Sequence, residues 1–254
     1  MADLTVKETG EDAGSSPITT GSISWTDEVR GICVVAGAQS VGLTTSTITM
    51  TGGGATWTDV MATVGDHKYQ SRRLLAIFVT TGHPTDGALT ITYNNDGGTF
   101  SEMFYEVYEL ANYDNTTPYD AAVSAGQENA SNSGTSLTLS SIGTVDASDV
   151  VLAAGACENG ADSFAFVTGI TLVGSGRGGG SDVRQLIVGT GTDDTPGVDW
   201  TTSGGHGGKL MALIFNDGEQ ASGSSPSVIA GHLAGPGGLA GSGGLAGNHG
   251  GIAG

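Results

Sequence analysis

Short hydrophobic runs of two kinds recur along this chain. Residues 89–93 and 137–139 alternate apolar with polar side chains, which predicts strands with one dry and one solvated face. Residues 74–79, 150–154 and 210–215 are continuous apolar runs, which predict central strands covered on both faces. No stretch keeps a convincing 3.6-residue period over three turns. The pattern therefore predicts an all-β chain.

Glycine, asparagine and aspartate bound the candidate strands at short intervals, as expected for strands joined by tight turns. Strands are predicted over residues 31–36, 46–50, 56–64, 72–80, 88–93, 103–110, 121–125, 136–142, 150–157, 164–172, 183–188 and 209–215. Such spacing predicts a β-sandwich over residues 22–218, a jelly roll of about a dozen strands. Residues 1–21 are polar and interrupted by glycine and proline, which predicts an N-terminal arm, either a clamp on a neighbouring subunit or a frayed terminus.

The C-terminal part has a three-residue period. Its repeated glycines are Gly235, Gly238, Gly241, Gly244, Gly247 and Gly250. Such a period is typical of polyproline-II-type strands packed together, because only glycine fits where the strands touch. Pro236 alone is little proline for collagen, so a collagen-like triple helix, a polyglycine-II bundle and a flexible linker are all open. We predict a linker at 219–227 and a self-associating tail at 228–254, with Leu239 and Leu245 along a remaining edge.

Composition and charge agree with this outline. The 254 residues include 45 glycines and only 13% charged residues, as in a β-rich protein with many turns. Net charge is −18, so phosphate backbones are repelled and we expect no nucleic-acid partner. No apolar run approaches ~18 residues, so no membrane span is expected. The first residues lack the pattern of a secretory signal peptide, which favours synthesis and folding in a cytoplasm.

Candidate chemistry is sparse. The five histidines show no zinc-binding spacing, and no G-x-S-x-G elbow occurs. Glu106 and Glu109 lie three apart on one predicted strand and should face opposite sides, which argues against a catalytic pair within that strand. Oxygen-rich turns at 94–97 and 193–194 would suit calcium, with ordinary solvated turns as the alternative; we expect no other cofactor or metal. Cys33 and Cys157 lie in apolar runs, which favours buried free thiols over a disulfide between strands.

Several short motifs resemble a jelly-roll domain common among bacteriophage structural proteins. The resemblance rests on Thr-Trp-Thr at 56–58, on residues 72–78, 84–92, 106–110 and 134–139, and on residues 198–204 with 210–215. The tail resembles the glycine-rich or collagen-like segments that trimerise phage fibre and capsid-decoration proteins. The resemblance implies a virion component, made in the host cytoplasm, and the period together with family habit implies a homotrimer.

We therefore predict a non-enzymatic structural subunit of a virion, a capsid decoration or fibre protein, with a capsid or tail protein as partner. The alternative is a carbohydrate- or receptor-binding adhesin that contacts a host surface glycan. For that alternative the candidate ligand-binding residues are Tyr113 and Tyr119 in one loop and His206 in a glycine-rich segment, which also suits a turn. Other aromatic candidates, with core packing as the competing explanation, are Trp25, Trp57 and Trp200. A hydrolase on the same fold has no supporting motif.

Overall fold

The computed structural model describes residues 2–12, 16–39, 47–60, 68–69, 73–94, 100–120, 122–126, 136–158, 161–167, 169–173, 183–202 and 207–218. These residues form strands and turns, which confirms the all-β prediction. In this part of the chain no helix has the length and apolar character needed to cross a membrane. The predicted linker at 219–227 and tail at 228–254 lie outside the described residues.

The first half of the chain forms two antiparallel sheets. Inner sheet 1 has the order β1-β9-β3-β7-β5, with β6 also paired to β7, and outer sheet 1 has the order β2-β8-β4. The strands are β1 (Asp3–Asp12), β2 (Ile18–Ile23), β3 (Arg30–Gln39), β4 (Thr47–Gly52), β5 (Trp57–Asp59), β6 (Lys68–Tyr69), β7 (Arg73–Thr80), β8 (Gly87–Asn94) and β9 (Phe100–Ala111).

The second half forms two more antiparallel sheets. Inner sheet 2 has the order β10-β17-β12-β15-β14, and outer sheet 2 has the order β11-β16-β13. The strands are β10 (Val123–Gly126), β11 (Ser136–Thr138), β12 (Val150–Glu158), β13 (Ala161–Phe166), β14 (Ile170–Leu172), β15 (Val183–Gly191), β16 (Gly197–Thr202) and β17 (Gly208–Phe215).

The two halves repeat one topology. The inner-sheet order β1-β9-β3-β7-β5 corresponds position by position to β10-β17-β12-β15-β14. The outer-sheet order β2-β8-β4 corresponds in the same way to β11-β16-β13. The pairing register of the inner sheets also repeats: Ile32 lies opposite Tyr108, Leu152 lies opposite Leu213, and the correspondence continues along both ladders. The molecule is thus an internal duplication of a two-sheet sandwich, which corrects the prediction of one sandwich over residues 22–218.

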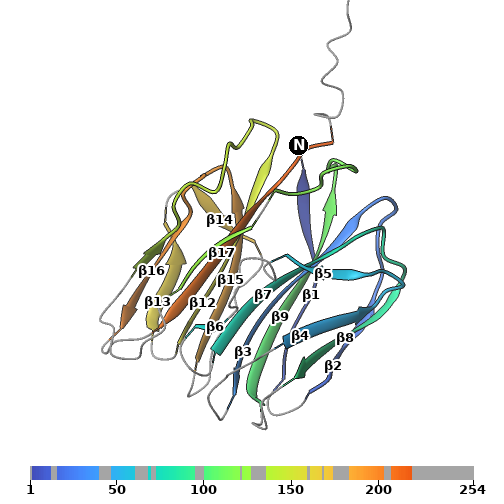
Figure 1. Ribbon diagram of the computed structural model, residues 1–254. Helices are drawn as coiled ribbons and strands as arrows, with labels where there is room; N and C mark the ends of the chain where they lie inside the picture. Colours follow the sequence, from blue (N-terminus) through green and yellow to red (C-terminus); the bar gives the residue numbers. More distant parts are fainter. Residues whose placement is uncertain are drawn as a thin grey trace, which may run out of the picture. The chain divides into compact units, whose positions relative to one another are not determined.

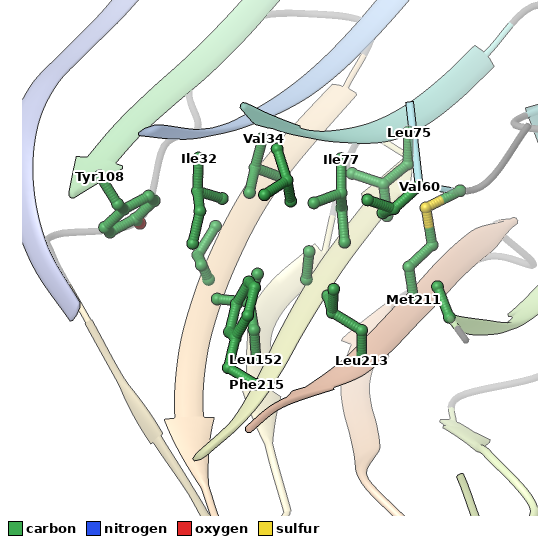
Figure 2. Close-up of a cluster of buried hydrophobic side chains, with 14 of the residues drawn as sticks. Ile32, Val34, Val60, Leu75, Ile77, Tyr108, Leu152, Met211, Leu213 and Phe215 are labelled. Carbon is green, nitrogen blue, oxygen red and sulfur yellow. The ribbon is translucent and has the colours of Figure 1, made fainter. Parts of the chain in front are cut away.

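The four sheets stack as layers, and three hydrophobic cores fill the spaces between them (Figure 1). The first core lies between outer and inner sheet 1 and includes Leu89 and Phe78. The second core lies between inner and outer sheet 2 and includes Ile214 and Val198. The central core joins the two inner sheets. In Figure 2, Ile32, Ile77 and Tyr108 on one side face Leu152, Met211, Leu213 and Phe215 on the other.

This layering explains the two hydrophobic patterns. Inner-sheet strands are covered on both faces, so β17 is buried at every position and β7 is buried from Leu74 to Thr80. Strand β8 belongs to an outer sheet, so Leu89, Ile91 and Tyr93 are buried while the residues between them are half-buried. Both sequence predictions are confirmed.

The N-terminal arm was a wrong prediction. Residues within the predicted span 1–21 form β1, which pairs with β9 from Asp3 opposite Ala111 to Asp12 opposite Met103, and most of β2. The physical reason is that β1 is an edge strand. Leu4 and Val6 pack against the central core while charged residues occupy other positions, so no continuous apolar run marks the strand.

Candidate functional site

An apolar groove lies at one edge of the second sandwich, between β13 of outer sheet 2 and β14 of inner sheet 2. It holds about 170 Å³ and is lined by Phe164, Ala165, Phe166, Ile170, Leu172 and Ile187. Leu172 is 45% exposed, the large hydrophobic side chain of highest exposure among the described residues. Within the described strands, β13 pairs with β16 alone and β14 with β15 alone. The groove therefore combines an apolar lining with two strand edges.

A separate polar hollow is lined by Ser141, Gly143, Thr144, Val145, Thr192 and Asp194. Gly169, next to Ile170 of the groove, packs so closely against Asp193 that an added Cβ would lie 2.7 Å from the Asp193 Cβ. The Ser141 hydroxyl donates to Asp194 Oδ2 at 2.9 Å. The Thr195 amide and hydroxyl donate to Asp193 Oδ1 at 2.9 and 3.0 Å. Asp193 thus accepts hydrogen bonds within its own turn and Asp194 accepts one from another loop, and calcium binding there stays a prediction.

Tyr113 is not the exposed aromatic platform that its loop position predicted. Its side chain belongs to the central core and is only 8% exposed, with the Arg30 guanidinium 5.0 Å from the ring centroid. The reason is that the loop is bound to the end of β17, since Tyr113 forms a β-bridge with Asp217. Tyr119 is half-buried, and its ring meets that of Phe215 edge to face at 6.3 Å between centroids. Desolvation by burial raises the pKa of Tyr119, and the Arg30 charge opposes this rise.

Two of the three tryptophans are core residues. Trp25 and Trp57 are each 9% exposed, and their ring centroids lie 6.4 Å apart. The Trp57 indole donates to the Gly52 carbonyl at 3.2 Å, which satisfies its nitrogen. The remaining candidates lie outside the described residues: the Trp200 side chain, His206, and in the tail Gly235, Gly238, Leu239, Gly241, Gly244, Leu245, Gly247 and Gly250.

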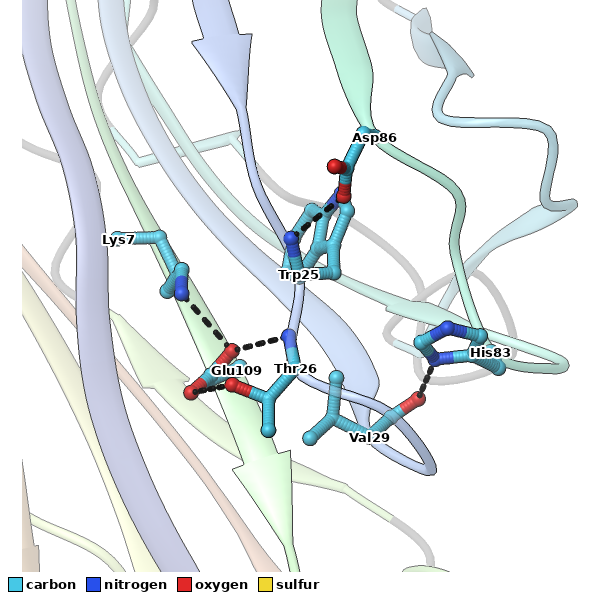
Figure 3. A network of polar contacts seen from close by, with 7 residues as sticks. All are labelled: Lys7, Trp25, Thr26, Val29, His83, Asp86 and Glu109. Atoms are coloured by element: carbon cyan, nitrogen blue, oxygen red, sulfur yellow. Dashed lines mark hydrogen bonds and ion pairs between the residues drawn. The ribbon is translucent and has the colours of Figure 1, made fainter.

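A polar network anchors the turn between β2 and β3 (Figure 3). Glu109 of β9 accepts from the Thr26 amide at 3.2 Å and from the Thr26 hydroxyl at 2.9 Å, and pairs with Lys7 Nζ of β1 at 3.0 Å. The Trp25 amide donates to Asp86 Oδ1 at 2.8 Å. Burial alone would raise the pKa of Glu109, but the hydrogen bonds and charge of Lys7 and the hydrogen bonds of Thr26 outweigh it and lower that pKa. These contacts tie four chain segments together: β1, the turn between β2 and β3, β9, and the residues before β8.

Glu106 lies on the opposite face of β9 from Glu109, as predicted from their spacing. It is fully buried and accepts a hydrogen bond from the Tyr108 hydroxyl. Burial, and then the Glu106 charge, raise the Tyr108 pKa above its usual range. Cys33, in the first core, and Cys157, in the second core, are buried free thiols, which confirms that prediction and excludes a disulfide between them.

No protein-family model, curated protein or solved structure matches the chain. Among the described residues, no three His, Cys, Asp or Glu side chains gather as a metal site would require. Sequence reasoning missed the groove and the duplication. Three weak signals mark the repeat: related turns at 26–29 and 146–149, Arg-x-Leu at 73–75 and 184–186, and Thr-x-Gly at 85–87 and 195–197. They are too short to stand out without the strand order.

Proposed function

We propose that the protein is a non-enzymatic structural component of a virion, a capsid decoration or fibre subunit that self-associates as a trimer through its glycine-rich tail. The observation that carries the proposal is the unbroken glycine period from Gly235 to Gly250. A period of three leaves one edge of a polyproline-II-type strand without side chains, and that edge serves close packing against identical strands. The tail carries no Lys, Arg, Asp or Glu after Glu219, so identical tails bring no like charges together.

We also propose that each sandwich is a jelly roll. If the strands of one sandwich are counted from one to eight, leaving out the two-residue β6, the inner sheets both have the order 1-8-3-6-5 and the outer sheets 2-7-4. The neighbours 1-8-3-6 and 2-7-4 are those of two interlocked Greek keys, and here the fifth strand pairs with the sixth. Tandem jelly rolls of this kind suit a building block of a shell or fibre, in agreement with the phage resemblance.

The body of the molecule supports this role because it has a large core of its own. Residues Met1–Ala221 form one compact unit. The two sandwiches share the central core, where Ile32, Ile77, Leu152 and Leu213 are each at most 1% exposed. We propose that this unit folds without help from the tail, and that the tail provides the self-association. Of the ligand-binding residues named for the adhesin alternative, Tyr113 is buried, Tyr119 is half-buried, and His206 lies outside the described residues.

The test of self-association is the mass of the full chain by light scattering, compared with a variant that ends at Ala221. We expect a trimer for the full chain and a monomer for the truncated variant, with the same far-UV circular dichroism per residue of the sandwich. Gly241→Val should weaken the trimer because a side chain enters the packed edge, while Ser242→Ala should leave it intact. A full chain that stays monomeric, or glycine and serine variants with equal effects, would contradict tail-mediated assembly.

The virion assignment needs a separate measurement. Antibodies raised against residues 1–221 should label the surface of purified particles from the source of this sequence in immunogold electron microscopy. Label confined to soluble material, with particles unlabelled, would contradict a structural role in the virion even if the chain is a trimer.

A further inference from the structure

The duplication allows the groove to be compared with the same place in the other sandwich. Trp57 of β5 pairs with Thr80 of β7, and Ile170 of β14 pairs with Gly191 of β15. Because the inner sheets share one register, Ile170 occupies the position of Trp57. The first sandwich thus carries at this edge an indole that packs against Trp25, while the second carries a smaller aliphatic side chain.

Two residues further along the same strands, glycine replaces a second aromatic residue of the first sandwich. Asp59 pairs with Phe78 in the first sandwich, and Leu172 pairs with Gly189 in the second. Phe78 is 2% exposed and belongs to the first core. Gly189 has no side chain, and Phe166 and Ile170 approach to within 2.6 Å of where its Cβ would lie. Phe166 and Ile170 thus fill the space over Gly189, and the groove remains beside Ile170, where the first sandwich has the indole of Trp57.

Two carboxylates belong to residues next to the groove, although neither lines it. Asp199, an exposed residue of β16, lies directly opposite Ala165 of the groove lining. Asp193 packs against Gly169 at the other side, beside Ile170. The chain as a whole has a net charge of −18. A segment that binds here is favoured if it carries positive charges on both sides of an apolar residue, because the acidic chain attracts it.

We propose that this groove binds an extended, basic segment of a partner protein and takes up one aromatic side chain from it. The groove volume of about 170 Å³ is close to that of apolar cavities of about 150 Å³ that accept a benzene ring. An extended segment would also use the edges of β13 and β14 for main-chain hydrogen bonds, as in β-strand addition. The inference goes beyond the proposed function because the site lies on the sandwich and does not use the tail.

The probe is a blocked pentapeptide of lysine, valine, tryptophan, valine and lysine, titrated into the full chain with ¹³C-labelled methyl groups. The Ile170, Leu172 and Ile187 methyl signals should shift in a saturable manner. A peptide with alanine in place of tryptophan, and one with aspartate in place of both lysines, should each bind at least about tenfold more weakly. Absence of shifts at these three residues up to millimolar peptide, or equal binding of all three peptides, would overturn the proposal.

Matched variants on β14 locate the contact. Leu172→Ser shortens an exposed lining residue and should weaken binding about tenfold, whereas Thr171→Ala, the exposed neighbouring residue, should leave it unchanged. Ile170→Trp restores the residue type of the first sandwich and should abolish peptide binding in a folded protein. Light scattering of the same samples reports the oligomeric state. A monomer that binds the peptide would support the groove proposal and contradict tail-mediated assembly. A trimer that does not bind the peptide would support tail-mediated assembly and contradict the groove proposal.

Discussion

At the scale of single residues, Glu109 makes a polar contact that depends on pH. Its carboxylate receives hydrogen bonds from Lys7 and Thr26, and together they lower its pKa below the usual 4.5. A carboxyl group whose pKa is lower in the folded state stabilises the fold above its unfolded pKa. That contribution is lost as the pH falls through the lowered folded pKa.

We expect Glu109→Gln to reduce the free energy of unfolding by about 1–3 kcal/mol at pH 7, because the Lys7 ammonium and the Thr26 donors lose a charged acceptor. The difference from the parent protein should shrink as the pH is lowered below about 4. Urea unfolding between pH 3 and 7 measures both. Asp3→Asn is the control, an exposed carboxylate of β1, the strand that carries Lys7, and should change stability by less than about 0.5 kcal/mol. A Glu109 effect independent of pH would contradict the charged contact.

The two thiols should be unreactive in the folded protein. Burial, followed by the charges of Glu106 and Glu8, raises the Cys33 pKa above the usual thiol range, and Cys157 is equally buried. Because the thiolate is the reacting species, neither cysteine should be modified by a disulfide reagent at pH 8 under native conditions. In denaturant both should react at once. Rapid labelling of one native thiol would show that its core opens locally.

At the scale of elements, β1 behaves as a structural strand and not as a dispensable arm. It pairs with β9 along its length, and Leu4 and Val6 pack against the central core. Deletion of residues 2–12 should therefore cost at least about 2 kcal/mol and expose the edge of β9. Chemical unfolding and light scattering measure the two effects. Thr5→Ala, at an exposed position of β1, should be neutral. A deletion variant as stable as the parent protein would contradict this role and support the prediction of an N-terminal arm.

Periodicity predicted the elements unevenly, for a physical reason. Inner strands such as β7, β12 and β17 carry long apolar runs because both faces are buried, and all three were predicted close to their observed bounds. The edge strands β1 and β2 were missed, and β13 and β14 were predicted as one strand over 164–172, because a strand beside solvent needs few apolar residues. The groove depends on which strands are neighbours. Nothing in the local sequence of Ile170 or Leu172 reveals that their counterparts are Trp57 and Asp59 of the other sandwich.

At the scale of the whole molecule, the central core decides whether the two sandwiches behave as one body. The inner sheets bury Leu75, Ile77, Leu152, Leu213 and Phe215 against one another, with none of them exposed. Each sandwich also has its own core against its outer sheet. Opening either sandwich removes one wall of the central core. Unfolding of one sandwich should therefore destabilise the other.

We accordingly expect one cooperative thermal transition for residues 1–221, with a calorimetric enthalpy equal to the van't Hoff enthalpy. Leu89→Ala in the first core and Ile214→Ala in the second each remove a fully buried side chain and should cost about 2–5 kcal/mol. If the body is cooperative, both variants lower the midpoint of the same single transition, as seen by differential scanning calorimetry. Leu213→Asp places an unpaired charge in the central core and should split or abolish that transition. Two transitions in the parent protein, with Leu89→Ala shifting only one of them, would show that the duplicated sandwiches unfold independently and that the central core is a weak contact.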